Sequence, residues 1–279
     1  MWLRGLIKPP PERALAYVDW AQQELGVAAA LSGDTSLMNA YASGDPYLAF
    51  AKEAGGVPRG ATKESHPAER NLFKVCALAT QYGMQEHGLA QSLGVQTAMA
   101  RNLLQAHRET YRKFWEWSQE QVDCAMLTGQ IQTVFGWPLL TTDDSNPRSL
   151  GNFPVQGSGG EMLRLACSML TEAGIWVCAP VHDAVLVEAP SSEIEDVVRQ
   201  TQAIMAEASR IVLAGFELAS DAEIIRWPAR YMDETRGRVM WDRVLTLASS
   251  EDEQRTDWPT DSDKLAHPNG QFVPPVQSY

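Results

Sequence analysis

The pentapeptide Val181-His182-Asp183-Ala184-Val185 is the stretch that decides the fold, because it separates two short apolar runs, residues 175–181 and 185–187. Two such runs joined by a polar pair are typical of a β-hairpin whose turn lies at that pair. The sequence therefore predicts a hairpin with Asp183 at its tip, where the strands hold the carboxylate in place. An ordinary turn without a chemical role is the alternative.

A second aspartate, Asp19, occupies the same kind of position. It ends the apolar run 14–18 and precedes a segment, residues 22–31, that has the composition of a helix. Two strand-end carboxylates, far apart in sequence, can share a pair of divalent metal ions, which is the arrangement that two-metal phosphoryl transfer needs. Asp19 and Asp183 are therefore the predicted metal ligands.

Composition limits the class of protein. The chain has 279 residues, 44% of them hydrophobic, which suffices for one large domain or two smaller ones. We predict no membrane span, because no run of about eighteen apolar residues occurs, and no signal peptide, because the N-terminus is too short and polar. The four widely spaced cysteines, with no Cys-x-x-Cys pattern, are typical of a reduced cytoplasmic protein.

The charge is unevenly distributed. A net charge of −12 argues against a general nucleic-acid-binding protein. Residues 52–113, however, contain nine basic and five acidic side chains, whereas the residues from 251 onward contain six acidic and two basic ones. The basic middle is compatible with a surface that faces phosphates, and equally with ordinary surface variation.

The hydrophobic pattern predicts an α+β fold, with helices flanking a β core. Two capping boxes, Ser158-Gly-Gly-Glu161 and Ser192-x-x-Glu195, predict where two helices begin, and Gly174 is expected to close the first of them. The remaining expected segments are short helices over 41–66, long helices over 67–84 and 96–126, strands over 129–140, a polar loop over 141–151 and a disordered acidic tail over 249–279.

Four side chains recur at four-residue spacing within the expected 67–84 helix: Arg70, Lys74, Leu78 and Tyr82. On a helix they form one slowly turning stripe roughly 18 Å long. Arg70 and Lys74 suit a polyphosphate, since Arg binds phosphate bidentately and Lys acts as a mobile charge. Tyr82 offers a flat ring to a base. A solvated helix face with one aromatic packed inward is the alternative.

These segments together resemble the C-terminal part of the family-A DNA polymerases, the DNA polymerase I type. Three motifs follow the family's order: residues 19–25 and 31–34 resemble motif A, 70–84 motif B and 181–183 motif C. Residues 152–158 resemble the segment that meets the minor groove of the primer–template. The likeness covers roughly residues 1–245.

The resemblance implies a polymerase palm, an antiparallel β-sheet with flanking helices, and a mainly helical fingers insertion. The implied boundaries are residues 1–40 for the first part of the palm, 41–128 for the fingers and 129–248 for the second part of the palm, with motif C in a hairpin over 175–189.

Roles for individual residues are implied by the same resemblance. Asp19 and Asp183 would hold two Mg²⁺ ions, and Lys74 would assist catalysis by protonating the departing pyrophosphate. Glu24 would block the ribose 2′-hydroxyl. The implied nucleotide-binding residues are Arg70, Lys74, Tyr82, Glu24, Leu78 and Gln23, and the implied DNA-binding residues are Arg148, Asn152, Gln156 and His182. The implied partners are primer–template DNA and dNTPs, and the implied location is the cytoplasm.

The sequence departs from the family in four residues and in length. Ala184 replaces the usual glutamate of motif C, Leu78 an aromatic residue, Gly26 an arginine, and Tyr47 stands about where many members place a histidine. Motif A begins at residue 19, so we expect a fragment, a truncated product, or a chain whose thumb or exonuclease domain lies on a separate polypeptide. Weaker binding of metal and DNA is expected.

Four hypotheses remain. The preferred one is a DNA-templated DNA polymerase core that works in replication or repair. The second is an inactive remnant that binds DNA or a partner subunit. The third is a single-subunit RNA polymerase, against which Glu24 argues, and the fourth is a general α+β protein in which the motifs arose by chance.

Overall fold

The computed structural model describes residues 2–235 and 237–255. Residues 11–226 form one compact unit, and the described residues of the two chain ends form another. The end unit contains a 3₁₀ helix, η1 (Trp2–Leu6), and helix α10 (Arg238–Arg255). Within it, Arg230 donates to the backbone oxygen of Gly5 at 3.0 Å and lies over the ring of Trp241.

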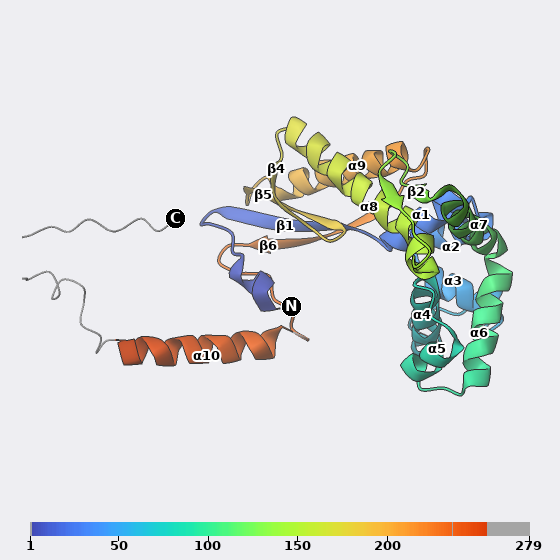
Figure 1. Ribbon diagram of the computed structural model, residues 1–279. Coiled ribbons are helices and arrows are strands. Elements are labelled where there is room, and N and C mark those ends of the chain that lie inside the picture. Colours follow the sequence, from blue (N-terminus) through green and yellow to red (C-terminus); the bar gives the residue numbers. More distant parts are fainter. Residues whose placement is uncertain (1, 236, 256–279) are drawn as a thin grey trace, which may run out of the picture. The chain divides into compact units, whose positions relative to one another are not determined.

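A four-stranded antiparallel sheet is the core of the larger unit (Figure 1). Its strands are β1 (Arg13–Trp20), β4 (Trp176–Val181), β5 (Ala184–Pro190) and β6 (Ser220–Arg226), in the order β4-β5-β1-β6. The predicted hairpin is therefore confirmed: β4 and β5 pair, and His182 and Asp183 form the turn between them. Strand β1 is central, and its residues Ala14, Ala16 and Val18 are fully buried.

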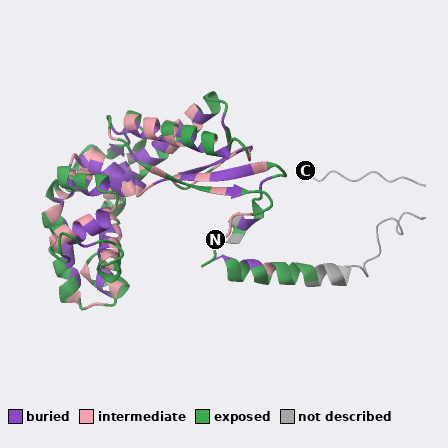
Figure 2. Ribbon diagram, turned by 180° about the vertical axis from the view of Figure 1, so that it is seen from behind, coloured by how far each residue is buried: buried purple, intermediate pink, exposed green. Residues whose placement is uncertain are grey.

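Two long helices cover one face of this sheet: α8 (Pro147–Glu172) and α9 (Ile194–Val212) (Figures 1 and 2). Met162 and Leu170 of α8 and Met205 of α9 are fully buried. Each such side chain stabilises the fold by roughly 1.5–3 kcal/mol relative to an exposed one. These side chains mark the sides of the two helices that form the core, and Gly174, with φ of 76°, follows the end of α8 as expected.

The remaining elements of the larger unit are mostly helices, with one small ribbon formed by the antiparallel strands β2 and β3. Of the short helices expected over 41–66, the structure has one wholly within that range, Pro46–Glu53, and a long helix begins at Pro67 as predicted. These elements are α1 (Gln23–Ser32), α2 (Thr35–Ala42), α3 (Pro46–Glu53), α4 (Pro67–Gln81), α5 (Glu86–Leu93), α6 (Thr97–Thr110), α7 (Arg112–Thr128), β2 (Gln130–Gln132) and β3 (Pro138–Leu140).

The prediction of one helix over residues 96–126 is wrong, because the chain turns at Tyr111 between α6 and α7. Tyr111 has φ of −117° and ψ of 50°, and its ring is buried against Phe50 and His107. Asp34, distant in sequence, accepts a hydrogen bond from the backbone N–H of Phe114 at 3.0 Å and so satisfies a free donor at the start of α7. Helical periodicity alone does not reveal these tertiary contacts.

The prediction that a helix begins with a capping box at Ser158 is also wrong, since Ser158 lies in the middle of α8. The helix begins earlier, at Pro147, inside the segment that we expected to be a loop, and the side chain of Asn146 accepts from the N–H of Arg148 there. Proline at the first position suits a helix start, because its missing N–H would have no partner there. Glu161 bonds instead to the β2–β3 ribbon, accepting from the Thr133 hydroxyl and from the N–H of Phe135.

Two further expectations are corrected. Helix α9 begins after Glu193, which makes no side-chain cap, so the Ser192-x-x-Glu195 box does not form. The expected tail over 249–279 is helical as far as Arg255, and the rest of that segment lies outside the described residues. No helix of the described chain is long and apolar enough to cross a membrane.

Candidate active site

The two predicted metal ligands lie side by side. Asp19 is near the end of β1, and Asp183 is in the β4–β5 turn, where its backbone oxygen accepts from the N–H of Trp20 at 3.4 Å. In the sheet register Asp19 is directly opposite Ala184 on one side and Asp221 of β6 on the other. Directly opposite residues point to the same face of a sheet, so Asp221 shares the face of Asp19.

The carboxylate of Asp19 is partly buried and has negative neighbours. Burial raises the pKa of Asp19, and the charges of Asp183, Asp221 and Glu223 raise it further. A bound cation would relieve this repulsion, and carboxylate oxygens are the ligands that Mg²⁺ prefers. Among the described residues no group of three or more His, Cys, Asp or Glu side chains is arranged to hold a metal ion. The donors that this site offers a cation are the carboxylates of Asp19 and Asp183, which are oxygen ligands of the kind that Mg²⁺ takes.

His182 and Ala184 flank Asp183 in the turn. His182 has a positive φ of 59°, an uncommon conformation for a residue with a side chain, and its Nδ1 lies 3.0 Å from the Asp183 carboxylate. Its side chain is exposed, whereas Ala184 is fully buried. A glutamate at this position would place a charged group in a closed site, so the surroundings of Ala184 suit its small side chain.

The basic end of the 67–84 stripe contacts the start of α3. The guanidinium of Arg70 lies 5.6 Å and the ammonium of Lys74 5.7 Å from the centre of the Tyr47 ring. Arg70 also donates to the Asp45 carboxylate at 2.5 Å, and the other oxygen of Asp45 caps α3 by accepting from the N–H of Leu48. The two cations thus share one half-buried site and are held on the same side of α4.

A second cluster joins three of the predicted residues from three elements. The hydroxyl of Tyr82, at the end of α4, lies 2.5 and 2.6 Å from the two carboxylate oxygens of Glu24 on α1. The amide of Gln156 on α8 donates to the same carboxylate at 2.5 Å. Burial and the hydrogen bond to Glu24 raise the pKa of Tyr82 to about 12, so the phenol keeps its proton at neutral pH.

The other predicted residues occupy different surroundings. Gln23 is buried, and its amide lies against Gly159 of α8, so it is closed off from solvent. Leu78 is half-buried on α4. Arg148 packs its aliphatic part on Gly83, and both Arg148 and Asn152 line a cavity of about 220 Å³ between α4, α7 and α8. The structure thus brings these two residues together at the cavity.

The unusual Gly26 has a local explanation in the packing of Tyr41. A Cβ atom at Gly26 would collide with Leu218 and lie 2.9 Å from the Tyr41 ring. The Tyr41 hydroxyl donates to the backbone oxygen of Ala21 at 3.0 Å and accepts from the N–H of Ala219 at 3.1 Å. The small residue therefore lets Tyr41 join the end of β1 to the segment before β6.

Sequence reasoning missed Asp221 and Asp45. Asp221 lies in a mostly exposed strand, where an acidic residue is typical of a solvent face, and only the pairing of β6 with β1 places it beside Asp19. Asp45 did have a usable signal: an aspartate immediately before a proline at the start of a helix is a common N-cap.

Comparison with known proteins identifies the family of the chain. The family model described as DNA polymerase family A matches residues 2–223. The chain therefore belongs to DNA polymerase family A. It is 29% identical over 205 residues to the thermostable DNA polymerase I of Thermus aquaticus, and the match covers 68% of this chain and 24% of that protein. It is 30% identical over 207 residues to the DNA polymerase of Mycobacterium phage L5, covering 74% of this chain and 33% of that protein.

A solved structure shows the same fold. The polymerase domain of Pol1 from M. smegmatis, in complex with DNA primer-template and dNTP, has a TM-score of 0.67 and 24% sequence identity to this chain. The likeness covers 80% of this chain and 41% of that one. The chain thus has the α+β fold of a polymerase domain and spans a quarter to a third of the length of the two relatives named above.

Proposed function

We propose that the chain catalyses DNA-templated DNA synthesis, the transfer of a nucleotide from a dNTP to a primer 3′-hydroxyl. The observation that carries this proposal is the proximity of Asp19, near the end of β1, to Asp183, in the adjoining β4–β5 turn. We assign residues 1–40 and 129–248 to the palm and 41–128 to the fingers. Work in replication or repair, in the cytoplasm, belongs to the same proposal.

Asp19 and Asp183 would hold two Mg²⁺ ions, whose chemistry is to activate the primer hydroxyl and to stabilise charge on the phosphates. His182, hydrogen-bonded to Asp183, orients this carboxylate and lies exposed where a primer end can reach it. Trp20 fixes the turn from the other side, because its N–H bonds to the backbone of Asp183. The protein's contribution is thus to hold two like charges close together before the cations arrive.

Arg70 and Lys74 would bind the β- and γ-phosphates, and Lys74 would protonate the pyrophosphate that leaves. Their shared position beside Tyr47 supports this role, because two cations held one turn apart match a polyphosphate. Binding requires Arg70 to exchange or share its partner Asp45. Leu78 and Gln23 would act indirectly, the first by shaping the sugar site and the second by supporting α1 from its buried position.

Glu24 would select deoxynucleotides by occupying the space of a ribose 2′-hydroxyl. Tyr82 and Gln156 support this role, since their hydrogen bonds fix the carboxylate from two sides. Arg148, Asn152, Gln156 and His182 would contact the primer–template. The M. smegmatis domain was solved with primer-template DNA and dNTP, which makes the same two ligands the natural ones to test here.

Primer extension with Mg²⁺ and all four dNTPs tests the proposal, comparing the chain with Asp183→Ala and with Asp143→Ala, an exposed loop residue that serves as the matched control. We expect extension by the wild type and by Asp143→Ala and none by Asp183→Ala. Extension that is equal in all three would come from a contaminant and would remove the proposal.

A second candidate is a remnant that binds DNA or a partner subunit without activity, and the buried Ala184 in place of a carboxylate favours it. It predicts DNA binding with no extension by the wild type, even when a polypeptide carrying a thumb or exonuclease domain is added. An RNA polymerase, in contrast, would prefer rNTPs in the same assay, against the expectation from Glu24.

A further inference from the structure

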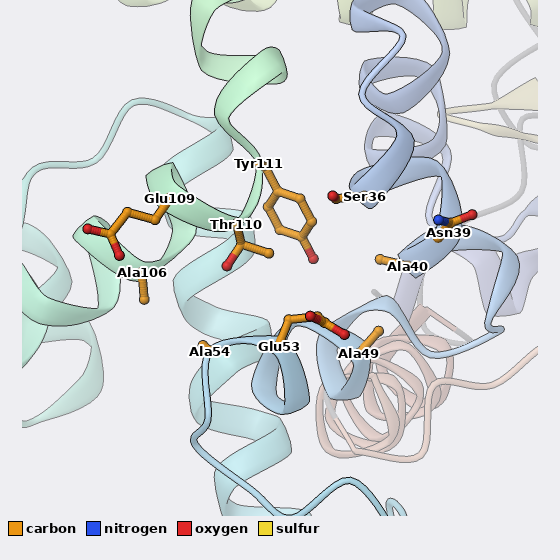
Figure 3. Close-up of a pocket in the computed structure, with 10 residues that line it drawn as sticks. All are labelled: Ser36, Asn39, Ala40, Ala49, Glu53, Ala54, Ala106, Glu109, Thr110 and Tyr111. Carbon is orange, nitrogen blue, oxygen red and sulfur yellow. The ribbon is translucent and has the colours of Figure 1, made fainter.

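A cavity of about 680 Å³ lies between α2, α3 and α6, and it shares no residue with the candidate active site (Figure 3). We call it the α2–α3–α6 cavity. Its volume is in the range of small-molecule sites, about 300–1,000 Å³. Small side chains leave the space open, since four of the ten lining residues are alanines. The lining residues are Ser36, Asn39, Ala40, Ala49, Glu53, Ala54, Ala106, Glu109, Thr110 and Tyr111.

The Tyr111 hydroxyl is a polar group that a ligand in the cavity could bind. The residue is only 2% exposed, and its hydroxyl is directed into the cavity between α2 and α3 (Figure 3). The hydroxyl makes no hydrogen bond to any residue of the described chain. Because this hydroxyl opens onto the cavity and has no partner within the described chain, it is available to bond to a molecule that enters there.

The charges of the lining select the kind of partner. Two lining residues are carboxylates, Glu53 and Glu109, and none of the ten described lining residues is Lys, Arg or His. The two carboxylates lie on different sides of the cavity, which Figure 3 shows. Glu109 accepts from Gln105 at 2.8 Å, whereas Glu53 has no partner among the described residues. Anions are therefore repelled, and a donor-rich cation is favoured.

The remaining polar groups fit the same partner. Asn39 offers an amide oxygen, and Ser36, Thr110 and Tyr111 offer hydroxyl oxygens, all of which accept hydrogen bonds from an ammonium group. The space is far larger than a single metal ion needs. Burial and the charges of Asp34 and Glu53 raise the pKa of Tyr111, so its hydroxyl is neutral and available for hydrogen bonding.

We propose that the α2–α3–α6 cavity binds a small organic cation with several separated ammonium groups, a polyamine. One ammonium group pairs with Glu53 beside the Tyr111 hydroxyl, and another reaches Glu109 on the far side. The same ammonium chemistry is present in a lysine side chain of a partner protein, so the test includes both sources.

Isothermal titration with spermidine tests the proposal at about 0.15 M salt, where charges separated by more than about 8 Å are largely screened. We expect saturable binding with one site per chain. Glu53→Gln should weaken the affinity about tenfold, because a charge-assisted hydrogen bond is lost. Ala106→Leu should also weaken it, by filling the cavity without changing its charge. Glu64→Gln, an exposed carboxylate elsewhere, is the matched control and should bind like the wild type.

Three results would overturn the proposal. One is the absence of binding at millimolar spermidine. Another is equal affinity in Glu53→Gln, Ala106→Leu and Glu64→Gln, which would show diffuse attraction to an acidic protein. The third is tighter binding of a lysine-containing peptide than of spermidine, which would make the cavity a protein-docking site. Circular dichroism of each variant checks that it is folded, and Tyr111→Phe, expected to weaken binding about threefold, provides a test that keeps both carboxylates.

Discussion

The carboxyl group of Asp19 lies among three negative neighbours, and its pKa is raised above the ordinary 3.8 by burial and by Asp183, Asp221 and Glu223. A raised acid pKa means that the folded chain binds more protons than the unfolded chain between the two pKa values. Stability therefore falls as the pH rises through that window, and at neutral pH the ionised group destabilises the fold.

Asp19→Asn should consequently raise the melting temperature in EDTA at pH 7. We expect a rise of about 1–2 °C, since the group is partly exposed and the effect is below about 1 kcal/mol. Mg²⁺ should stabilise the wild type and not the variant. The measurement is differential scanning calorimetry, with Asp143→Asn as control. A lower melting temperature for Asp19→Asn in EDTA would contradict this view of the site.

The hydroxyl of Tyr82 is a second group whose effect can be tested by changing one residue, because it bonds to the Glu24 carboxylate. Tyr82→Phe should lower the preference for dNTPs over rNTPs by about threefold to tenfold, the effect of losing one such hydrogen bond. Competitive single-nucleotide incorporation measures the ratio. If Glu24→Ala lowers the preference and Tyr82→Phe leaves it unchanged, Glu24 acts without support from the hydroxyl.

The start of helix α8 shows that a short sequence pattern can predict a helix boundary wrongly. Ser158 and Glu161 have the spacing of a capping box, yet they lie in the middle of α8, and the Ser158 hydroxyl has no partner within the described chain. A four-residue pattern does not reveal that a helix has already begun eleven residues earlier at Pro147. Glu161 is instead a long-range contact to the β2–β3 ribbon.

The variant Ser158→Ala therefore distinguishes a Ser158 that caps a helix from a Ser158 that is buried within one. A lost N-cap would cost roughly 0.5–2 kcal/mol. Removing a buried hydroxyl without a partner should instead leave the free energy of unfolding unchanged or raise it slightly. Urea denaturation gives the value, and Glu161→Leu is the contrasting variant, expected to destabilise by about 1–3 kcal/mol because it leaves the N–H of Phe135 unpaired.

Asp45 links two elements, since one oxygen caps α3 and the other binds Arg70 of α4. Asp45→Asn should keep most of the cap and weaken the hold on Arg70, so dNTP affinity should rise with little loss of stability. Asp45→Ala should lose the cap as well, at about 1 kcal/mol. Fluorescent-dNTP titration and urea denaturation measure the two effects. Weaker dNTP binding by Asp45→Asn would show that Asp45 positions Arg70 for the nucleotide.

At the scale of the whole molecule, a net charge of −12 opposes DNA, so binding must rest on a few local cations. We expect the affinity for a primer–template to fall roughly tenfold or more between 50 and 200 mM salt. Arg148→Gln should reduce the salt slope by about 1 if that residue contacts a phosphate. Fluorescence anisotropy provides the slopes, with Arg199→Gln on α9 as the matched control. Equal slopes for both variants would remove Arg148 from the DNA-binding surface.

The sequence by itself determined the elements that local pattern encodes. Alternating and continuous apolar runs predicted the hairpin around Asp183 and the strand that ends near Asp19, and a four-residue spacing placed Arg70, Lys74 and Tyr82 on one helix. The motif order then indicated the family, which the comparison confirms. These features depend on neighbours within a few residues, and for that reason they can be read from the chain alone.

Only the tertiary structure decided which of these elements meet. The Glu24 cluster joins residues that are 58 and 132 positions apart in sequence. Strand register places Asp221 beside Asp19, and Asp34 accepts a hydrogen bond at the start of α7 from a residue 80 positions away. Sheet register and helix breaks of this kind depend on how buried side chains fill the space between elements. No local periodicity specifies that packing, so these contacts, like the α2–α3–α6 cavity, appear only in the folded chain.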